Sequence, residues 1–348
     1  MNIPKEENII RNWKGNKDKP LVSICCTAYN HENYIEDSIK GFLIQETDFP
    51  FEILIHDDAS TDNTANIIRE YEKQYPNIIK PIYQIENQYS QGRRIMPIVV
   101  KQGSGEFIAL CEGDDYWISP LKLQQQYDYL IDNPNVDICF TAAFSEDAES
   151  KQRKRLCNYS DRIKTFSLSE VVRGGGGFMP TASLMIRSVI FDNLPDWYNN
   201  APVGDYYLQV LSSIKGGAIY LPLISCVYRT NAIGSWTLRQ KELDAYKLYE
   251  EVLLHIDCLD KLVSYDILKS DVNYIKSLRL ANVTPYLLLS KEFSIANKAM
   301  ISSWEYNKVS NLKQISLYFL SSYPNLTKKL LRLYKYCQKI KNSAMKEK

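Results

Sequence analysis

The segment 112–115, Glu-Gly-Asp-Asp, places three carboxylates within four residues, directly after the apolar run 106–111. Carboxylates this close disfavour one another's ionised form, so the cluster is costly to hold without a cation. Their hard oxygen atoms suit Mg²⁺ or Mn²⁺, either of which leaves positions open for a diphosphate. The alternative is a solvated acidic turn that caps the helix beginning at Pro120. Tyr116 and Trp117 add apolar cover beside the charges, which favours a site.

Two further acidic positions stand at the boundaries of expected elements. Asp57 and Asp58 follow the apolar run 51–56, and Asp205 follows Gly204 at the start of a helical pattern. Adjacent strand residues point to opposite faces, so one carboxylate of the pair can reach a given ligand, such as a base N–H or a ribose hydroxyl. Helix capping is the competing interpretation at both positions, and the local sequence alone favours it.

Short apolar runs alternate with amphipathic stretches through the first 141 residues. This alternation predicts an α/β fold with a mostly parallel sheet covered by helices on both faces. Ligands bind beyond the carboxyl ends of such strands, where the acidic residues stand. The expected strands are 21–26, 51–56, 78–84, 106–111 and 136–141, and the expected helices are 34–45, 67–75, 96–102 and 120–133.

The rest of the chain is less regular. We expect an irregular lead-in at 1–20, one α/β domain at 21–236 and a helical region at 237–348. Within the domain, we expect a basic loop at 151–155, a glycine hinge or lid at 174–177, a strand at 180–187, a helix at 204–216 and two short strands within 218–229.

Composition excludes several classes of protein. The formal net charge of +1 in 348 residues excludes a globally basic nucleic-acid coat and a solvating acidic protein. Eight Cys without a C-x-x-C pair indicate reduced, buried thiols, and three His make a Cys/His zinc site improbable. No apolar leader and no apolar run of membrane-spanning length occurs, so we expect a cytoplasmic protein.

The end of the chain is strongly basic. Between Thr327 and Lys348, eight Lys and Arg stand against one Glu, giving 8 − 1 = +7. Leu330, Leu333, Tyr334, Cys337 and Ile340 share one helical face. Two interpretations are equally favoured for 327–348: a surface helix packed on the body, or a helix lying on the anionic inner face of the cell membrane.

Four blocks together resemble the inverting family 2 glycosyltransferases, whose fold is the Rossmann-like GT-A fold. They are LVSICCTAYNHENYIEDSI, ILIHDDASTDNT, GEFIALCEGDDYW and PVGDYYLQVL, and the resemblance covers about residues 20–236. It implies a loop around a nucleotide base, a metal-binding Asp-x-Asp region and an acidic catalytic base. By position, Thr27, Ala28, Tyr29 and Asp58 bind the base, Asp114 lies near the ribose, Asp115 binds the metal and Asp205 is the general base.

This sequence departs from the family pattern in two places. Many relatives carry a His after Val-Tyr-Arg that helps to hold the metal or diphosphate, and here that position is Asn231. The usual Ala-Arg-Asn stretch is replaced by 95–97, Ile-Met-Pro, so Arg93 or Arg94 is expected to supply the positive charge. Trp117 is a candidate for stacking on the donor sugar.

The resemblance implies transfer of a sugar, with inversion, from a nucleotide diphosphate donor to a hydroxyl, in the manner of a hexosyltransferase. A UDP-sugar is the favoured donor, a glycan or lipid-linked acceptor the favoured partner, and cell-surface polysaccharide assembly the expected setting. No nucleic-acid partner is expected. Two alternatives remain: a nucleotide-sugar-binding protein without transferase activity, and a nucleotidyltransferase, whose Gly-rich, Lys-containing signature is absent from TAYNHENY.

Overall fold

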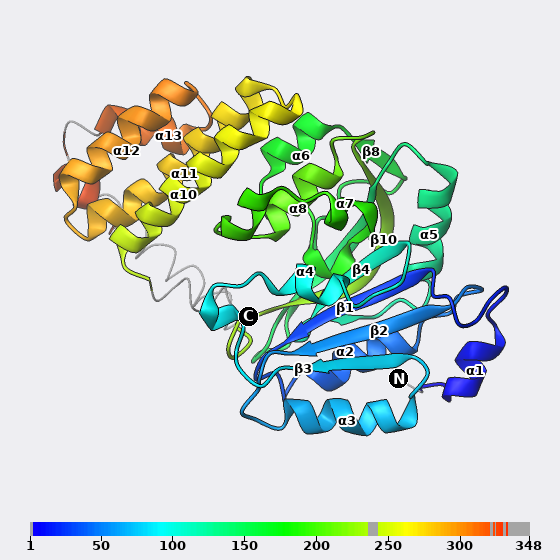
Figure 1. The fold of residues 1–348 in the computed structure, drawn as a ribbon. Helices are drawn as coiled ribbons and strands as arrows, with labels where there is room; N and C mark the ends of the chain where they lie inside the picture. The colour runs from blue at the N-terminus through cyan, green and yellow to red at the C-terminus, as the bar shows by residue number, and fades with distance from the viewer. Residues whose placement is uncertain (1–2, 236–242, 321–322, 324, 330–331, 333–348) are drawn as a thin grey trace. The chain divides into compact units, whose positions relative to one another are not determined.

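The computed structural model describes residues 3–235, 243–320, 323, 325–329 and 332 (Figure 1). The chain divides into two compact units, Met1–Lys241 and Glu242–Lys348. The first unit holds a single large sheet with helices packed against it, and the second is helical. The strand ends that carry the acidic motifs all belong to the first unit.

Four parallel strands form one half of the sheet, in the order β3-β2-β1-β4. They are β1 (Val22–Ala28), β2 (Phe51–Asp57), β3 (Ile79–Tyr83) and β4 (Phe107–Glu112). Each lies where an apolar run predicted a strand. β3 contains Pro81, which has no N–H to donate, and it is the edge strand of the sheet, where such a residue is tolerated.

The other half of the sheet is mixed. β6 (Ile138–Asp147) pairs in parallel with β10 (Ala218–Thr230), and β9 (Met185–Arg187) runs antiparallel between β4 and β6. β10 is one continuous strand with register shifts around Leu221 to Cys226, where two short strands were expected. The α/β prediction is therefore confirmed, whereas the antiparallel strands of this half were not anticipated.

Two short strands have unexpected positions. β5 (Tyr116–Trp117) pairs antiparallel with β10 directly after the acidic turn. The basic segment expected as a loop contains β7 (Arg153–Leu156), which pairs with β6. That expectation was wrong because backbone pairing with β6, and not side-chain composition, decides the conformation of 153–156. β8 (Lys164–Phe166) pairs with the beginning of β10.

The helices of the first unit follow the predicted alternation. α2 and α5 lie within the predicted ranges, and α3 begins three residues before its predicted range. The helices are α2 (Ile35–Leu43), α3 (Thr64–Gln74), α4 (Ile95–Val100), α5 (Lys122–Asp132), α6 (Leu168–Gly174), α7 (Val189–Asp192) and α8 (Asp205–Ser212).

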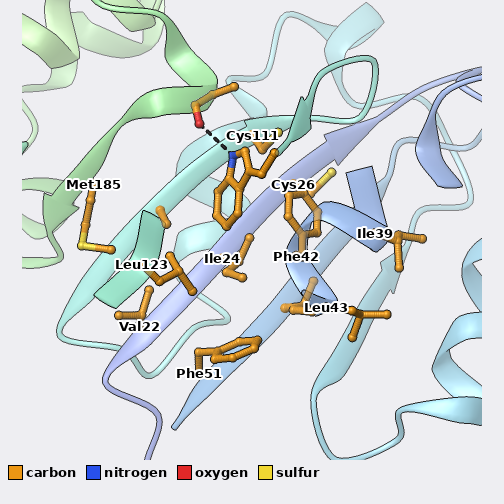
Figure 2. Close-up of a cluster of buried hydrophobic side chains, with 14 of the residues drawn as sticks. Val22, Ile24, Cys26, Ile39, Phe42, Leu43, Phe51, Cys111, Leu123 and Met185 are labelled. Carbon is orange, nitrogen blue, oxygen red and sulfur yellow. Dashed lines mark hydrogen bonds between the residues drawn. The ribbon is translucent and has the colours of Figure 1, made fainter. Parts of the chain in front are cut away.

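The main core lies between β1, its neighbouring strands and α2 (Figure 2). Val22, Ile24 and Cys26 alternate along β1, and all three side chains are fully buried. Phe42 of α2 packs edge-to-face on Trp117, with ring centroids 4.9 Å apart. This packing fixes the strands whose carboxyl ends carry the site.

The segment around α1 (Glu6–Arg11), which precedes β1, joins this core. α1 is a short helix, and Ile9 and Trp13 are buried beside it. The Trp13 ring lies 5.4 Å from that of Phe51. The expectation of an irregular lead-in was therefore wrong: two apolar side chains among polar neighbours are enough to dock this segment.

The second unit contains α10 (Ala245–Leu262), α11 (Lys269–Leu289), α12 (Phe293–Tyr306) and α13 (Leu312–Leu320). Their apolar faces form a separate core that includes Leu280, Leu287 and Met300. The helical prediction for this region is confirmed over the described residues. Most of the basic segment 327–348 lies outside them. None of the helices that the structure describes is both long and apolar enough to cross a membrane.

Candidate active site

The carboxyl ends of β1, β2 and β4 lie side by side. Thr27 is aligned with His56 on one side and with Glu112 on the other. The chain continues from these ends in register: Asp58 N–H donates to Ala28 O at 2.9 Å, and Gly113 N–H donates to Thr27 O at 2.8 Å. The three predicted motifs therefore meet at one edge of the sheet.

The acidic turn packs tightly against the loop after β1. A Cβ atom at Gly113 would lie 2.9 Å from Nδ1 of His31 and 3.1 Å from Cβ of Ala28. Glycine is therefore required at this position by contact with the protein itself. Ser38 of α2 donates to Gly113 O at 3.1 Å and holds the turn from a second side.

The carboxylates of this region act on one another. Burial and the charges of Asp114 and Asp205 raise the pKa of Glu112 to about 8. Burial, together with Asp114 and Glu112, raises the pKa of Asp115 well above its ordinary value, while Arg229 opposes the shift. Both carboxyls therefore favour the protonated form unless a cation compensates their charge.

Asp115 is 1% exposed, and its two oxygens differ. Oδ1 accepts a hydrogen bond from the backbone N–H of Arg229 at 2.8 Å. Oδ2 is buried and has no hydrogen-bond partner, an expensive condition that a bound cation would relieve. Within the described residues, no group of three or more His, Cys, Asp or Glu side chains is arranged to hold a metal ion. Asp115 therefore fits a metal as a single protein ligand, with the remaining ligands coming from a substrate and water.

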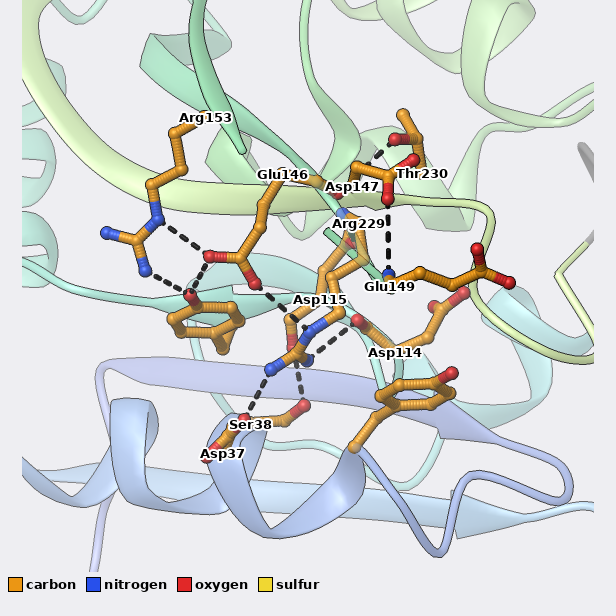
Figure 3. A network of polar contacts seen from close by, with 12 residues as sticks. Asp37, Ser38, Asp114, Asp115, Glu146, Asp147, Glu149, Arg153, Arg229 and Thr230 are labelled. Atoms are coloured by element: carbon orange, nitrogen blue, oxygen red, sulfur yellow. Dashed lines mark hydrogen bonds and ion pairs between the residues drawn. The ribbon is translucent and has the colours of Figure 1, made fainter. Parts of the chain in front are cut away.

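A network of charged side chains surrounds the acidic turn (Figure 3). Its centre is Arg229 at the end of β10, whose guanidinium donates to Asp114 O at 2.9 Å and pairs with Asp37 of α2. Glu146 of β6 lies 3.9 Å from Arg229 Nε and 2.7 Å from Arg153 Nε. No individual role is predicted for Arg229 from the sequence. The available signal was a charged residue that ends an otherwise apolar strand beside a predicted site.

Asp205 begins α8 and lies near the acidic turn, because its charge contributes to the raised pKa of Glu112. Its Oδ1 accepts from the N–H of Tyr206 at 2.8 Å. This bond lies within the first turn of α8 and agrees with the capping interpretation, whereas the catalytic role of Asp205 stays a prediction. Asp205 also acts on the buried phenol of Tyr198, whose pKa burial raises.

The two candidate arginines lie in different places. Arg94 packs beside Gly204: a Cβ there would lie 3.3 Å from Arg94 Cδ, and Arg94 Nη2 donates to Ala201 O. Arg93 is exposed, and its Nη1 donates to Gln88 Oε1 at 2.7 Å. Arg94 is therefore the arginine beside the predicted base, whereas Arg93 belongs to the loop before α4.

The predicted base-binding loops are well ordered by polar contacts. Both Asp58 oxygens accept backbone hydrogen bonds, from Gln88 at 2.7 Å and from Tyr89 at 3.0 Å. Asp58 is buried and does not cap α3; Asp62 Oδ1 instead accepts from the N–H of Thr64, the first residue of that helix, at 2.9 Å. Tyr29 is 38% exposed, and the side-chain oxygen of Asn30 accepts from Thr61 N–H at 2.8 Å.

Two expectations need correction or restriction. Trp117 is fully buried, and its indole N–H donates to Ala182 O at 2.8 Å, so it is a core residue and cannot stack on a sugar. The antiparallel pairing of β5 with β10 turns it inward.

Asn231 donates to Asp147 Oδ2 at 2.6 Å, and its backbone is left-handed with φ of 59°. The glycine run 174–177 begins at the last residue of α6, and its role as a hinge or lid stays a prediction.

Comparisons with known proteins show which family and which fold this chain resembles. Residues 23–194 match the family model described as "Glycosyl transferase family 2". An uncharacterized protein of Mycobacterium tuberculosis is 36% identical over 219 residues, which are 62% of this chain and 60% of that protein. This chain therefore spans about 60% of the length of that relative. The putative teichuronic acid biosynthesis glycosyltransferase TuaG of Bacillus subtilis is 33% identical over 121 residues, covering 35% of this chain and 44% of TuaG.

A solved structure shares the fold. Residues 1–349 of TarS from S. aureus, in complex with UDP-GlcNAc, superimpose with a TM-score of 0.60 at 13% identity. The match covers 88% of each chain. The expected GT-A fold class, with its helical C-terminal extension, is confirmed by this likeness.

Proposed function

We propose that the chain, whose residues 23–194 match the model of glycosyltransferase family 2, moves a sugar from a nucleotide diphosphate donor to an acceptor hydroxyl with inversion. The observation that carries the proposal is the gathering of Glu112, Asp114, Asp115 and Asp205 at one edge of the sheet. Acidic groups whose pKa values are raised, in Asp115 even beside Arg229, are suited to a substrate that brings both a pyrophosphate and a divalent ion.

Asp205 is proposed as the general base. It stands at the beginning of a helix, close enough to Glu112 at the end of β4 for its charge to help raise the pKa of that carboxyl. In an inverting transfer, its carboxylate accepts the proton of the acceptor hydroxyl as that oxygen attacks the anomeric carbon. Arg94 and Tyr198 pack against Gly204, directly before Asp205, and so hold the base in place.

Asp115 is proposed as the protein ligand of Mg²⁺ or Mn²⁺, through the buried oxygen that has no partner. When bound there, the ion neutralises charge that develops on the leaving diphosphate. Asp114, in the same turn, is proposed to bind the ribose. Asn231 is neutral and is held by Asp147, and residues 95–97 are uncharged. These positions therefore do not provide the positive charge or metal ligand that many relatives have there.

We propose that the nucleotide base lies against Thr27, Ala28 and Tyr29, with Asp58 below it. The register of β1 and β2 puts these residues at the same edge as the acidic turn, and the exposed ring of Tyr29 offers a face for stacking. A UDP-sugar is the favoured donor, and TarS, which shares the fold, has been solved with UDP-GlcNAc.

The proposed setting is the assembly of a cell-surface polysaccharide, with a glycan or a lipid-linked acceptor. The similarity to TuaG, a putative teichuronic acid biosynthesis glycosyltransferase, supports it. The basic segment 327–348 fits work at the inner face of the cell membrane, through anionic lipid headgroups.

A thermal-shift panel of nucleotides and nucleotide sugars, each with and without Mn²⁺, tests the proposal. A ligand at 100 times its dissociation constant adds about 2.7 kcal/mol to the free energy of unfolding. We expect the largest shift with a uridine nucleotide plus Mn²⁺. A panel without any nucleotide-dependent shift would contradict the proposal.

Donor consumption separates transfer from binding alone. Incubation of the shifted nucleotide sugar with cell-envelope glycans should release the nucleoside diphosphate. A thermal shift without such release in any glycan fraction would favour a nucleotide-sugar-binding protein, the alternative that Asn231 and the altered 95–97 stretch suggest. Release of pyrophosphate from a nucleoside triphosphate would instead identify a nucleotidyltransferase.

A further inference from the structure

Arg229 binds the acidic turn through both its backbone and its side chain. Its N–H donates to Asp115 Oδ1 at 2.8 Å, and its Nη1 donates to Asp114 O at 2.9 Å. Its Nη2 pairs with Asp37 of α2 (Figure 3). One residue of β10 therefore ties the turn after β4 to the helix after β1.

The guanidinium is also enclosed on its remaining sides. It lies 4.2 Å from the ring centroid of Tyr116 and 5.3 Å from that of Tyr34, and the side chain is 3% exposed. Glu146 balances its charge at 3.9 Å from Nε. A planar, buried cation that touches three separate elements has little freedom to move, so it sets the position of whatever it binds.

The consequence for Asp115 is specific. Because Oδ1 is held by the Arg229 N–H, the carboxylate cannot rotate freely, and Oδ2 is left as the oxygen without a partner. We propose that Arg229 is a positioning residue that presents Asp115 Oδ2 to the divalent cation. This inference rests on the proposed function, since it takes Asp115 as the metal ligand. Partners that orient a metal ligand typically contribute 10- to 100-fold to metal affinity.

The test measures Mn²⁺ binding directly, by the loss of the paramagnetic resonance signal of free Mn²⁺, in the presence of UDP. Arg229→Lys keeps the charge but removes the planar fork that bonds to Asp114 O and Asp37 and so fixes the backbone N–H of Arg229 against Asp115. We expect it to weaken Mn²⁺ binding by about 10-fold or more. Affinity for UDP without metal and the melting temperature should stay near those of the wild-type chain. A metal-specific loss of this kind is not expected from a general loss of packing.

Arg153→Lys is the matched control. Arg153 belongs to the same network, through Glu146 and the hydroxyl of Tyr116, but makes no contact with the turn. It should bind Mn²⁺ like the wild-type chain. Equal losses in Arg153→Lys and Arg229→Lys would overturn the proposal, as would wild-type Mn²⁺ binding by Arg229→Lys.

Asp37→Asn covers the case in which Arg229→Lys does not fold. Asp37 is half-exposed, so its change removes a partner of the guanidinium without burying a new charge. A weaker Mn²⁺ affinity is expected, and an unchanged affinity would overturn the proposal. If Arg229→Lys binds Mn²⁺ like the wild-type chain, the role of Arg229 is wrong but the proposed transferase function is not affected. If the wild-type chain binds no Mn²⁺ in the presence of UDP, both the role of Arg229 and the proposed metal-dependent transfer are wrong.

Discussion

The charge of Asp205, at the start of α8, reaches Glu112, at the end of β4, and helps to raise the pKa of that carboxyl to about 8. The two residues come from different elements: the beginning of α8 favours a carboxylate at Asp205, but it does not require another carboxylate near it. Like charges this close together lower the free energy of unfolding unless a bound cation compensates them. This relationship connects the proposed base to the proposed metal site.

Asp205→Asn should keep donor binding and lose transfer by a factor of about 10²–10⁴, because the amide cannot accept the hydroxyl proton. Initial rates and the nucleotide-sugar dissociation constant check this. Asp196→Asn removes an exposed carboxylate from the preceding loop and serves as the control, with unchanged transfer expected. Transfer at the wild-type rate by Asp205→Asn would assign the base elsewhere.

Arg94→Gln and Arg93→Gln form a second matched pair. Arg94 packs against Gly204 and donates to Ala201 O, so its loss should displace Asp205 and lower kcat by up to about 10²-fold. Arg93 contacts Gln88 in an exposed loop, and its change should leave kcat as it is. A larger effect from Arg93 would show that the donor phosphates lie against that loop.

Trp117→Phe should behave as a core substitution. It removes the indole donor to Ala182 O and leaves a small cavity beside Phe42, at a cost of about 2–3 kcal/mol in the free energy of unfolding. The KM for the donor should not change. Chemical denaturation and donor titration measure the two quantities. A raised KM with unchanged stability would place Trp117 in the sugar site after all.

The strand ends that carry the site were predictable because they depend on local patterns. An apolar run followed by an acidic pair marks both β2 and β4, and the parallel sheet brings such ends to one edge. Trp117 was mistaken for a sugar contact because its burial depends on Cys226, its partner in β10, far along the chain. Arg229 was missed for the same reason: its contacts with Asp114 and Asp115 are long-range.

Backbone pairing explains the other errors. The strand Arg153–Leu156 exists because β6 offers an unpaired edge, whereas its sequence reads as solvated and basic. The docking of α1 depends on the contact between Trp13 and Phe51, which are far apart in the sequence, so no local pattern predicts it. The choice between Arg93 and Arg94 similarly requires the position of Gly204.

Lys122 makes the free energy of unfolding depend on pH. Its side chain is fully buried, and burial lowers its pKa from 10.5 to about 8, although Nζ donates to Gln126 Oε1 at 2.8 Å. Between pH 8 and 10.5 the unfolded chain binds more protons at this group than the folded chain, so the free energy of unfolding rises with pH across that window. Below pH 8 Lys122 is protonated in both states, so the full cost of burying its charge remains.

Lys122→Met should therefore be more stable than the wild-type chain at pH 7, by up to about 3 kcal/mol for a shift of this size. The gain should shrink as pH rises from 8 to 10.5. Urea denaturation of both proteins at a series of pH values measures the difference. A difference that does not depend on pH would mean that Lys122 is charged in neither state or equally in both.

The central claim is that Asp115 holds a divalent ion that a nucleotide diphosphate helps to bind. Calorimetric titration of UDP into the wild-type chain and into Asp115→Asn, each with and without Mn²⁺, measures this coupling directly. Mn²⁺ should strengthen UDP binding to the wild-type chain by about 10-fold or more, a coupling free energy near 1.4 kcal/mol, and should have no effect on Asp115→Asn. UDP binding that ignores Mn²⁺ in the wild-type chain, or that gains equally in Asp115→Asn, would contradict the account.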